Sequence, residues 1–216
     1  KQARNLANLM VKIGKGVDRK VVALLSDMNQ PLGCAVGNAL ELREAIDTLH
    51  GKGPADFYEH CMVVASHMLK AGGKAHTLPA ARKMAEQAIQ QGRSWEKFRA
   101  LVAAQGGDVR TIDNPELLPA AAHIQTIASP ASGYLSRLDA REVGETAVDL
   151  GAGRQKKGDP IDLAVGILVH HKVGDRVEKG ETLFTIHASQ PGHIPPAAER
   201  LLAACQFSTE SNPLPL

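Results

Sequence analysis

A polar, glycine-containing loop is the first place where residue types suggest chemistry. The loop covers residues 26–37 (SDMNQPLGCAVG) and follows a short apolar run, residues 20–25 (KVVALL), that predicts a buried strand. Ligands bind α/β sheets at the carboxyl ends of strands, where loops and helix N-termini converge. The same composition suits a polar connector that only caps the next helix, and spacing alone leaves both interpretations open. The residues that carry the first interpretation are the polar Ser26, Asp27, Asn29 and Gln30 and the permissive Gly33 and Gly37.

Two carboxylates follow this loop on a helix predicted over residues 38–50. Glu41 and Glu44 are three residues apart and so lie on neighbouring faces of that helix. One of them can turn back toward the loop carbonyls and share a hard cation, since such ions take oxygen ligands. The alternative is a solvated carboxylate that pairs with Arg43 or Lys52.

A glycine- and lysine-bearing loop, residues 151–159 (GAGRQKKGD), has the composition of a phosphate-facing loop. It lacks the Walker A spacing and does not follow a predicted strand, which favours a surface turn. His170 and His171 are adjacent, so in a strand they point to opposite faces and do not share one metal. His60 and His67 lie on one predicted helix, where packing is favoured over catalysis.

The segment GILVHHKVGDRVEKGETLFTIHA, residues 166–188, has the rhythm of a biotinyl or lipoyl carrier. Such carriers present a lysine at a hairpin tip, whereas Lys172 stands in HHKVGD, outside the usual acceptor setting. We therefore interpret the segment as a barrel-like hairpin module with a structural role.

The elements that must position these residues divide near residue 110. We expect the helical edge of an α/β domain over 1–110, a connector over 111–118, an α+β domain over 119–207, and a tail over 208–216. Thr77 and Asp139 are expected N-caps, and Ser94 forms half of a capping box. The helices are expected over 2–13, 38–50, 55–71, 78–91, 94–105, 139–150 and 195–205, and the strands over 20–25, 123–128, 133–138, 161–170, 176–177 and 182–187.

Composition excludes several classes of protein. The 216 residues carry a net charge of +2, which does not predict a nucleic-acid partner. No apolar run approaches the roughly 18 residues of a membrane span. The three cysteines form no CxxC pair, which favours the cytoplasm over secretion. The chain opens on Lys1 inside a predicted helix, so we expect it to be a piece of a longer protein.

Two long motifs resemble the pyrimidine-nucleoside phosphorylase and thymidine phosphorylase family. Residues 26–54 (SDMNQPLGCAVGNALELREAIDTLHGKGP) are similar to its central signature, and residues 150–188 are similar to its C-terminal domain. The resemblance implies that this chain is the C-terminal half of a subunit in a homodimeric enzyme that cleaves uridine or thymidine with phosphate, giving the base and a pentose 1-phosphate. It also implies that the principal catalytic residues lie outside this chain, which alone is expected to be inactive. The alternative is a non-catalytic scaffold or interaction module derived from that family.

The resemblance also implies a monovalent cation site. Family members hold a potassium-like ion near the phosphate, with backbone carbonyls that match Leu32 and Ala35 and a carboxylate that matches Glu44. Glu41 is the less favoured carboxylate. In this chain by itself the potassium site need not be filled. The resemblance also implies that the loop at 151–159 corresponds to one that helps to close the cleft between the two domains of family members.

Overall fold

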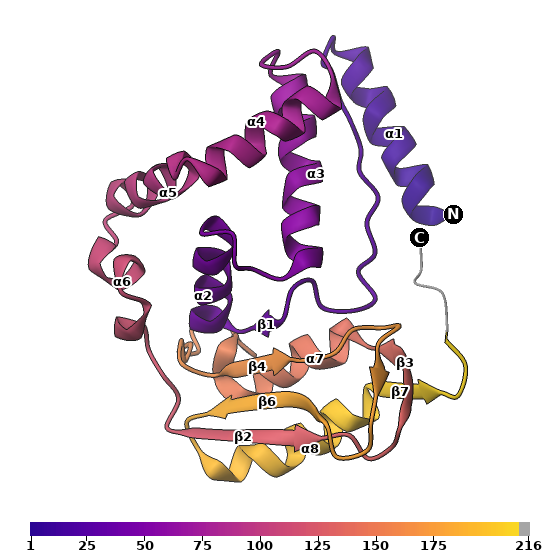
Figure 1. The fold of residues 1–216 in the computed structure, drawn as a ribbon, viewed down its shortest axis with the longest axis vertical. Helices are drawn as coiled ribbons and strands as arrows, with labels where there is room; N and C mark the ends of the chain where they lie inside the picture. Colours follow the sequence, from indigo (N-terminus) through magenta and orange to yellow (C-terminus); the bar gives the residue numbers. More distant parts are fainter. Residues whose placement is uncertain (212–216) are drawn as a thin grey trace.

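The structure is a computed structural model, and it describes residues 1–211. Its fold combines helices with antiparallel sheets (Figure 1). Helices come first and strands dominate the second half of the chain, as the change in sequence periodicity predicts. The helices are α1 (Gln2–Gly16), α2 (Asn38–Leu49), α3 (Ala55–Ala71), α4 (Leu78–Gln90), α5 (Arg93–Ala104), α6 (Val109–Asp113), α7 (Ala140–Ala147) and α8 (Ile194–Ala203), with short turns of helix η1 (Pro115–Leu117), η2 (Val148–Ala152) and η3 (Pro191–His193). The strands are β1 (Ala35–Val36), β2 (His123–Ala128), β3 (Gly133–Leu138), β4 (Gly166–Val169), β5 (Arg176–Val177), β6 (Thr182–Ala188) and β7 (Cys205–Ser208).

Two antiparallel sheets form the lower part of the molecule. One sheet has the strand order β1-β4-β6-β2 and the other has the order β5-β3-β7. Their apolar side chains face α7 and α8, and together these elements bury the main core. Burial of such apolar surface is the main favourable term in folding. The largest fully buried side chains belong to Phe184, Leu135, Leu138, Ile167, Leu183, Ile186 and Leu201.

The strand β1 links the two halves of the chain. It comes from the helical half, yet it pairs with β4, with Ala35 opposite Leu168 and Val36 opposite Ile167. Gly37, just after β1, has a φ of 136°. A Cβ there would lie 2.6 Å from the carbonyl oxygen of Val165, so only glycine allows this approach. The C-terminal sheet is therefore completed by residues from before the expected boundary near 110.

The upper helices hold a second, smaller core. Ala39, Ile46, Ile112 and Leu118 are buried there, and Trp95 packs against the cluster. The predicted cap at Thr77 is confirmed, because its hydroxyl accepts the amide of Ala80 at 3.3 Å. The predicted cap at Asp139 is confirmed in the same way by the amides of Arg141 and Glu142.

The predicted capping role of Ser94 is wrong. Helix α5 begins one residue earlier, at Arg93, after Gly92 in a left-handed conformation. Glycine turns the chain at that point, so the helix needs no side-chain cap at Ser94.

The strand predicted over residues 20–25 is also absent, and the segment is extended but unpaired. Val22 is 56% exposed, because no neighbouring strand among residues 1–211 covers the segment. An apolar β-branched run needs a partner strand to become a buried strand. All strand pairs in residues 1–211 are antiparallel. The described residues therefore form an α+β fold, and the α/β sheet predicted for residues 1–110 does not occur among them.

Several predicted boundaries also change. The sheets at 119–207 do not close into a barrel within the described residues. The strand predicted from 161 begins only at Gly166, and the connector contains α6 and η1. Ser208, the expected start of the tail, ends strand β7, and residues 212–216 of that tail lie outside the described part.

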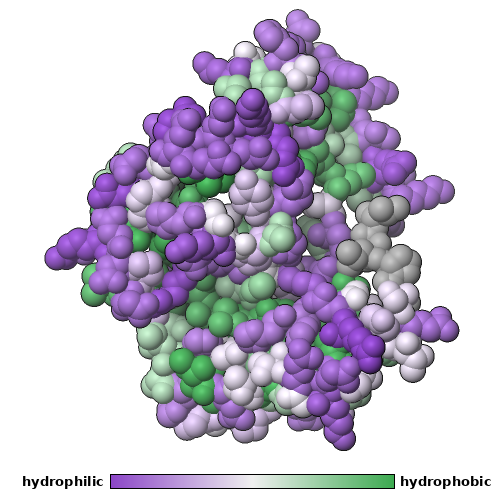
Figure 2. All heavy atoms as spheres, in the orientation of Figure 1, coloured by the Kyte–Doolittle hydropathy of each residue, from purple (hydrophilic) through white to green (hydrophobic). Residues whose placement is uncertain are grey.

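Helix α1 has an apolar stripe and no buried residue. Leu6, Leu9, Met10 and Ile13 are all exposed on it. Figure 2 shows green hydrophobic surface beside this helix as well as in the hollow between the upper helices and the sheets. No helix in residues 1–211 has both the length and the apolar content to cross a membrane.

Candidate functional site

The segment at residues 31–36 (PLGCAV), hereafter the 31–36 segment, runs between the upper helices and the sheets. The amide of Val169 in β4 donates to the carbonyl of Cys34 at 2.7 Å, and β1 continues this pairing. Gly33 has a φ of 69°, a left-handed conformation that favours glycine. The segment therefore rests on β4 along one edge, and its other edge is held by side chains.

Glu44 holds that other edge. One carboxylate oxygen, Oε2, accepts the amides of Cys34 at 2.7 Å and of Ala35 at 3.0 Å. A Cβ at Gly33 would overlap the same carboxylate, so the backbone closes around it. Burial raises the pKa of Glu44, although the two amides and Lys172 oppose this. Glu44 is thus fixed against the segment by charge-assisted hydrogen bonds.

Glu41 has a different role. Its Oε1 accepts the amide of Gly37, the N-cap residue of α2, at 2.9 Å. It therefore satisfies an amide at the start of the helix, where a negative charge is also favourable. The two carboxylates diverge: Glu44 binds the 31–36 segment, and Glu41 binds the helix end.

Lys172 approaches the 31–36 segment from the C-terminal half. Its ammonium nitrogen Nζ donates to the carbonyl of Pro31 at 2.6 Å and to the carbonyl of Gly33. It also lies 3.1 Å from Oδ2 of Asp56, at the start of α3. The same Oδ2 accepts the amide of Gly33 at 3.1 Å. Lys172 and Asp56 together hold both backbone groups of Gly33.

Burial and the nearby charge of Lys172 act in opposite directions on the pKa values of Asp56 and Cys34. Burial by itself would raise the pKa of Asp56, but the hydrogen bond and charge of Lys172 and the amide of Gly33 outweigh it and hold that pKa below its usual value. Burial raises the pKa of the Cys34 thiol, and nearby Lys172 only partly opposes this. The thiol is therefore not activated as a nucleophile.

Sequence reasoning did not find the role of Lys172. It weighed the residue only as a carrier lysine, and no short-range spacing links position 172 to positions 31, 33 or 56. The turn that presents Lys172 is built locally, because the amide of Lys172 donates to Asp175 Oδ2 at 2.7 Å. The next amide, of Val173, donates to Gln30 Oε1 at 2.9 Å. The contact of Lys172 with Pro31, Gly33 and Asp56 therefore arises only when the two halves of the chain pack together.

The predicted ion ligands are brought together in part. Ala35 and Glu44 are in direct contact, through the amide of Ala35. Leu32 is 45% exposed and stands between Pro31 and Gly33, whose carbonyls bind Lys172. Groups of three or more histidine, cysteine or acidic side chains able to hold a metal do not occur in the described residues. Any cation at the segment would therefore depend on backbone carbonyls as well as Glu44.

The polar loop at 26–30 lines two open hollows. The larger, of about 690 Å³, lies between Asp27–Gln30 and the β3–α7 region around Arg137 and Arg141. The smaller, of about 390 Å³, includes Ser26, Pro31, Glu41 and His60. The loop is also tied down, because the carbonyl of Asn29 accepts the amide of Ala140 at 3.0 Å.

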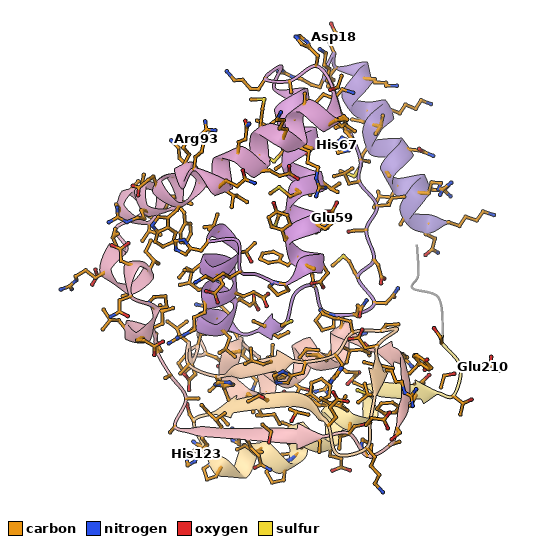
Figure 3. All side chains as sticks on the ribbon, viewed as in Figure 1. Asp18, Glu59, His67, Arg93, His123 and Glu210 are labelled. Carbon is orange, nitrogen blue, oxygen red and sulfur yellow. The ribbon has the colours of Figure 1, made fainter. Side chains whose placement is uncertain are left out.

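The remaining candidates are not among the side chains that bind the 31–36 segment. His170 bonds the hydroxyl of Thr185 at 2.8 Å, while His171 faces Glu181 at 3.5 Å, so the two rings have different partners. Figure 3 places His67 on α3 among the upper helices, away from the sheets. In the 151–159 loop, Asp159 accepts the amide of Lys156 at 2.7 Å, so the loop folds onto itself as a surface turn.

Comparison with known proteins agrees with the motifs. Residues 134–208 match the family model "Pyrimidine nucleoside phosphorylase C-terminal domain". Over 188 residues the chain is 50% identical to a pyrimidine-nucleoside phosphorylase of Geobacillus stearothermophilus and, separately, to one of Staphylococcus haemolyticus. It is 48% identical to a pyrimidine-nucleoside phosphorylase of Staphylococcus aureus strain USA300.

The matches cover most of this chain but less than half of each relative. They span 87% of the chain and 43% of the length of each of these relatives. The matched family domain contains β3–β7, the strand β4 that pairs with the 31–36 segment, and Lys172. Residues 134–208 are therefore similar to the C-terminal domain of pyrimidine nucleoside phosphorylases, and the chain as a whole is similar to part of such enzymes.

Proposed function

We propose that this chain is part of an enzyme that uses phosphate to cleave pyrimidine nucleosides, with uridine or thymidine as substrate. Its 50% sequence identity to pyrimidine-nucleoside phosphorylases over 188 residues supports this reaction class. In such a reaction phosphate attacks the anomeric carbon of the sugar while the pyrimidine base leaves. The protein must place a dianion and stabilise charge on the leaving base. We extend the proposal to a homodimer that acts in the cytoplasm.

Within this enzyme, the 31–36 segment and Glu44 form the wall of a monovalent cation site, with the carbonyls of Leu32 and Ala35 as further ligands. Oxygen ligands of this kind suit a hard cation such as potassium. A bound potassium ion would offset negative charge near the phosphate and order the segment. The residues themselves do the positioning: Glu44 holds two amides of the segment, and β4 holds its other edge.

The observation that carries this proposal is the contact between Glu44 and Ala35. Ala35 directs its amide to Glu44, on the edge of β1 away from β4. In a strand the amide and the carbonyl of one residue point to the same edge. The Ala35 carbonyl therefore belongs on the Glu44 side, where no strand among residues 1–211 pairs with β1. A carbonyl and a carboxylate side by side fit a cation.

A chimera tests the proposed function. The 188 matched residues of this chain replace the corresponding residues of the Geobacillus stearothermophilus relative, and base release from uridine and thymidine is measured with and without phosphate. We expect phosphate-dependent release by the chimera and none by the 216-residue chain alone. A folded chimera without phosphorolysis would favour the scaffold alternative.

Two variants of that chimera test the cation site. We expect Glu44→Ala to lower phosphorolysis and its response to added potassium, because the carboxylate is both a ligand and the anchor of two amides. Glu41→Ala is the matched control and should do less, since its carboxylate binds the end of α2. A full potassium response in Glu44→Ala would refute the assignment.

A further inference from the structure

We propose that Lys172 is a positioning residue that acts as an internal cation for the 31–36 segment. Its ammonium group holds the carbonyls of Pro31 and Gly33 in place and so presents the rest of the segment to Glu44 and its cation. The part of this inference that concerns the cation rests on the proposed function. The part that concerns the order of the segment does not.

The first argument is the match between donors and acceptors. An ammonium group has three N–H donors and no acceptor. The side chain of Lys172 meets three oxygens, the carbonyls of Pro31 and Gly33 and the carboxylate of Asp56. With its side chain only 20% exposed, Lys172 depends on these partners instead of water. An amine placed in this way is fully satisfied and has one preferred position.

The second argument is that Lys172 and Glu44 hold different groups of the same short segment. Lys172 takes carbonyls, at Pro31 and Gly33, whereas Glu44 takes amides, at Cys34 and Ala35. Asp56 adds the amide of Gly33. A cation and an anion fix the direction of the intervening peptide groups more strongly than neutral partners would. The carbonyls of Leu32 and Ala35 are absent from the set that Lys172 binds, so they stay free for another cation.

The third argument is that the ammonium group of Lys172 and the segment it binds come from different halves of the chain. Lys172 lies within residues 134–208, the matched C-terminal domain, while the segment and Asp56 lie in the helical half. Removal of the ammonium group would leave the Asp56 carboxylate and two carbonyls without their shared donor, and such unpaired groups are costly when partly buried. The C-terminal domain therefore holds the segment through the side chain of Lys172 as well as through backbone pairing with β4.

Hydrogen–deuterium exchange of the 216-residue chain tests the ordering. Lys172→Met keeps the apolar stem and removes the charge, and Lys179→Met is the matched control, because Lys179 is exposed on the neighbouring turn. We expect peptides that cover 31–36 to exchange at least tenfold faster in Lys172→Met, while β6 exchanges at the wild-type rate. Asp56→Asn should accelerate the same peptides, and Lys179→Met should change nothing.

Two outcomes would overturn the ordering role. One is wild-type exchange of the 31–36 peptides in Lys172→Met. The other is acceleration spread evenly over the chain, β6 included, which would mean that Lys172 only contributes to global stability.

The link to the cation is tested in the chimera described above. We expect Lys172→Met to raise the potassium concentration for half-maximal phosphorolysis at least tenfold, with KM for the nucleoside changed less than twofold. An unchanged potassium requirement would overturn the link. If the chimera is inactive before any mutation, the proposed function fails, and the exchange experiment still decides the role of Lys172. If exchange is unchanged while the chimera responds to potassium, the positioning role fails and the proposed function stands.

Discussion

The ammonium of Lys172 lies 3.1 Å from the carboxylate of Asp56, and the two residues come from opposite halves of the chain. Lys172 leaves the sheet domain in the turn after β4, and Asp56 stands in the first turn of α3. Their pairing, together with the β1–β4 ladder, fixes the 31–36 segment between the two halves.

The Lys172–Asp56 pair should stabilise the fold at neutral pH and lose its effect in acid. The folded-state pKa of Asp56 lies below its ordinary value of 3.8. A lowered carboxyl pKa gives stability that is complete above the unfolded-state value and is lost as pH falls through the folded-state value. Urea unfolding should show Asp56→Asn less stable by about 1–2 kcal/mol at pH 7, a figure below that for fully buried pairs because Asp56 is partly exposed.

The pH dependence of this difference separates charge from shape. The difference between wild type and Asp56→Asn should shrink as pH falls below the ordinary carboxyl pKa of 3.8 toward the lower folded-state pKa of Asp56. A difference that stays constant with pH would show that asparagine costs stability by a route other than lost charge.

His187 should make the fold sensitive to mild acid. Its Nε2 is buried without a hydrogen-bond partner, and burial, followed by the charge of Arg43, holds its pKa below the ordinary 6.5. A histidine with a lowered folded-state pKa costs stability as pH falls below the unfolded-state value, because the unfolded chain binds the proton first. We expect the free energy of unfolding to fall between pH 7 and pH 5, and to fall less in His187→Leu.

The control for this prediction is the exposed residue His76. His76→Leu should keep the wild-type slope of stability against pH. Part of the slope should also survive in His187→Leu, because burial and the neighbouring His171 lower the pKa of His170 as well. Equal slopes in wild type and His187→Leu would contradict the prediction.

Glu41 should contribute to stability as a helix cap. Its bond to the amide of Gly37 satisfies one of the unpaired amides at the start of α2. Loss of such a bond costs about 0.5–2 kcal/mol. Glu41→Ala should lower the urea midpoint accordingly, and Glu41→Gln, which keeps an acceptor oxygen, should recover most of the loss. A Glu41→Ala protein as stable as wild type would exclude the capping role.

The sheet core should dominate the stability of the chain. Phe184 is 1% exposed at the centre of β6, and its truncation to alanine leaves a large cavity. Such changes cost about 3–5 kcal/mol. Ile124→Ala in the neighbouring strand β2 is the control, because Ile124 is 60% exposed and should cost under about 0.5 kcal/mol. Similar losses in the two variants, measured by thermal unfolding, would place the core elsewhere.

Helix α1 should be the least protected helix of the chain. It has an apolar stripe, but no residue of the helix is buried. Isolated helices of this length are marginal in water when no tertiary packing supports them. Amides of α1 should exchange within the earliest time points, far ahead of α7, which buries Val143 and Ala147. Protection of α1 equal to that of α7 would show that another surface covers the stripe, for instance in a second copy of the chain.

Local rules in the sequence predicted most of the helices and several strands. Thr77 and Asp139 mark helix starts because a short side-chain oxygen satisfies amides of the first turn, which is a local interaction. Helix α3 was predicted with the bounds Ala55–Ala71 that the structure gives it, because its apolar periodicity and flanking glycines are also local signals. The motifs at 26–54 and 150–188 likewise sufficed to indicate the family.

Local rules failed wherever the outcome depends on a distant partner. The apolar run at 20–25 has the composition of a buried strand, yet it is exposed because no strand lies beside it among residues 1–211. Two residues, Ala35 and Val36, became a strand only because β4 offers them a free edge. Neither segment carries a local signal that says whether a partner strand lies beside it.

In the candidate site, too, some features follow from residue spacing and others only from tertiary packing. The sequence by itself determined that two carboxylates, Glu41 and Glu44, follow the loop at a spacing from which a helix residue can reach back to it. Only the tertiary structure decided that Glu44 accepts the amides of Cys34 and Ala35. Only the tertiary structure decided that Lys172 and Asp56 meet at Gly33, because that contact joins three separate elements whose approach is set by packing. Hydrogen bonds along a helix or turn are fixed by residue spacing, whereas an ion pair between halves of a chain exists only once the cores that carry its members have formed.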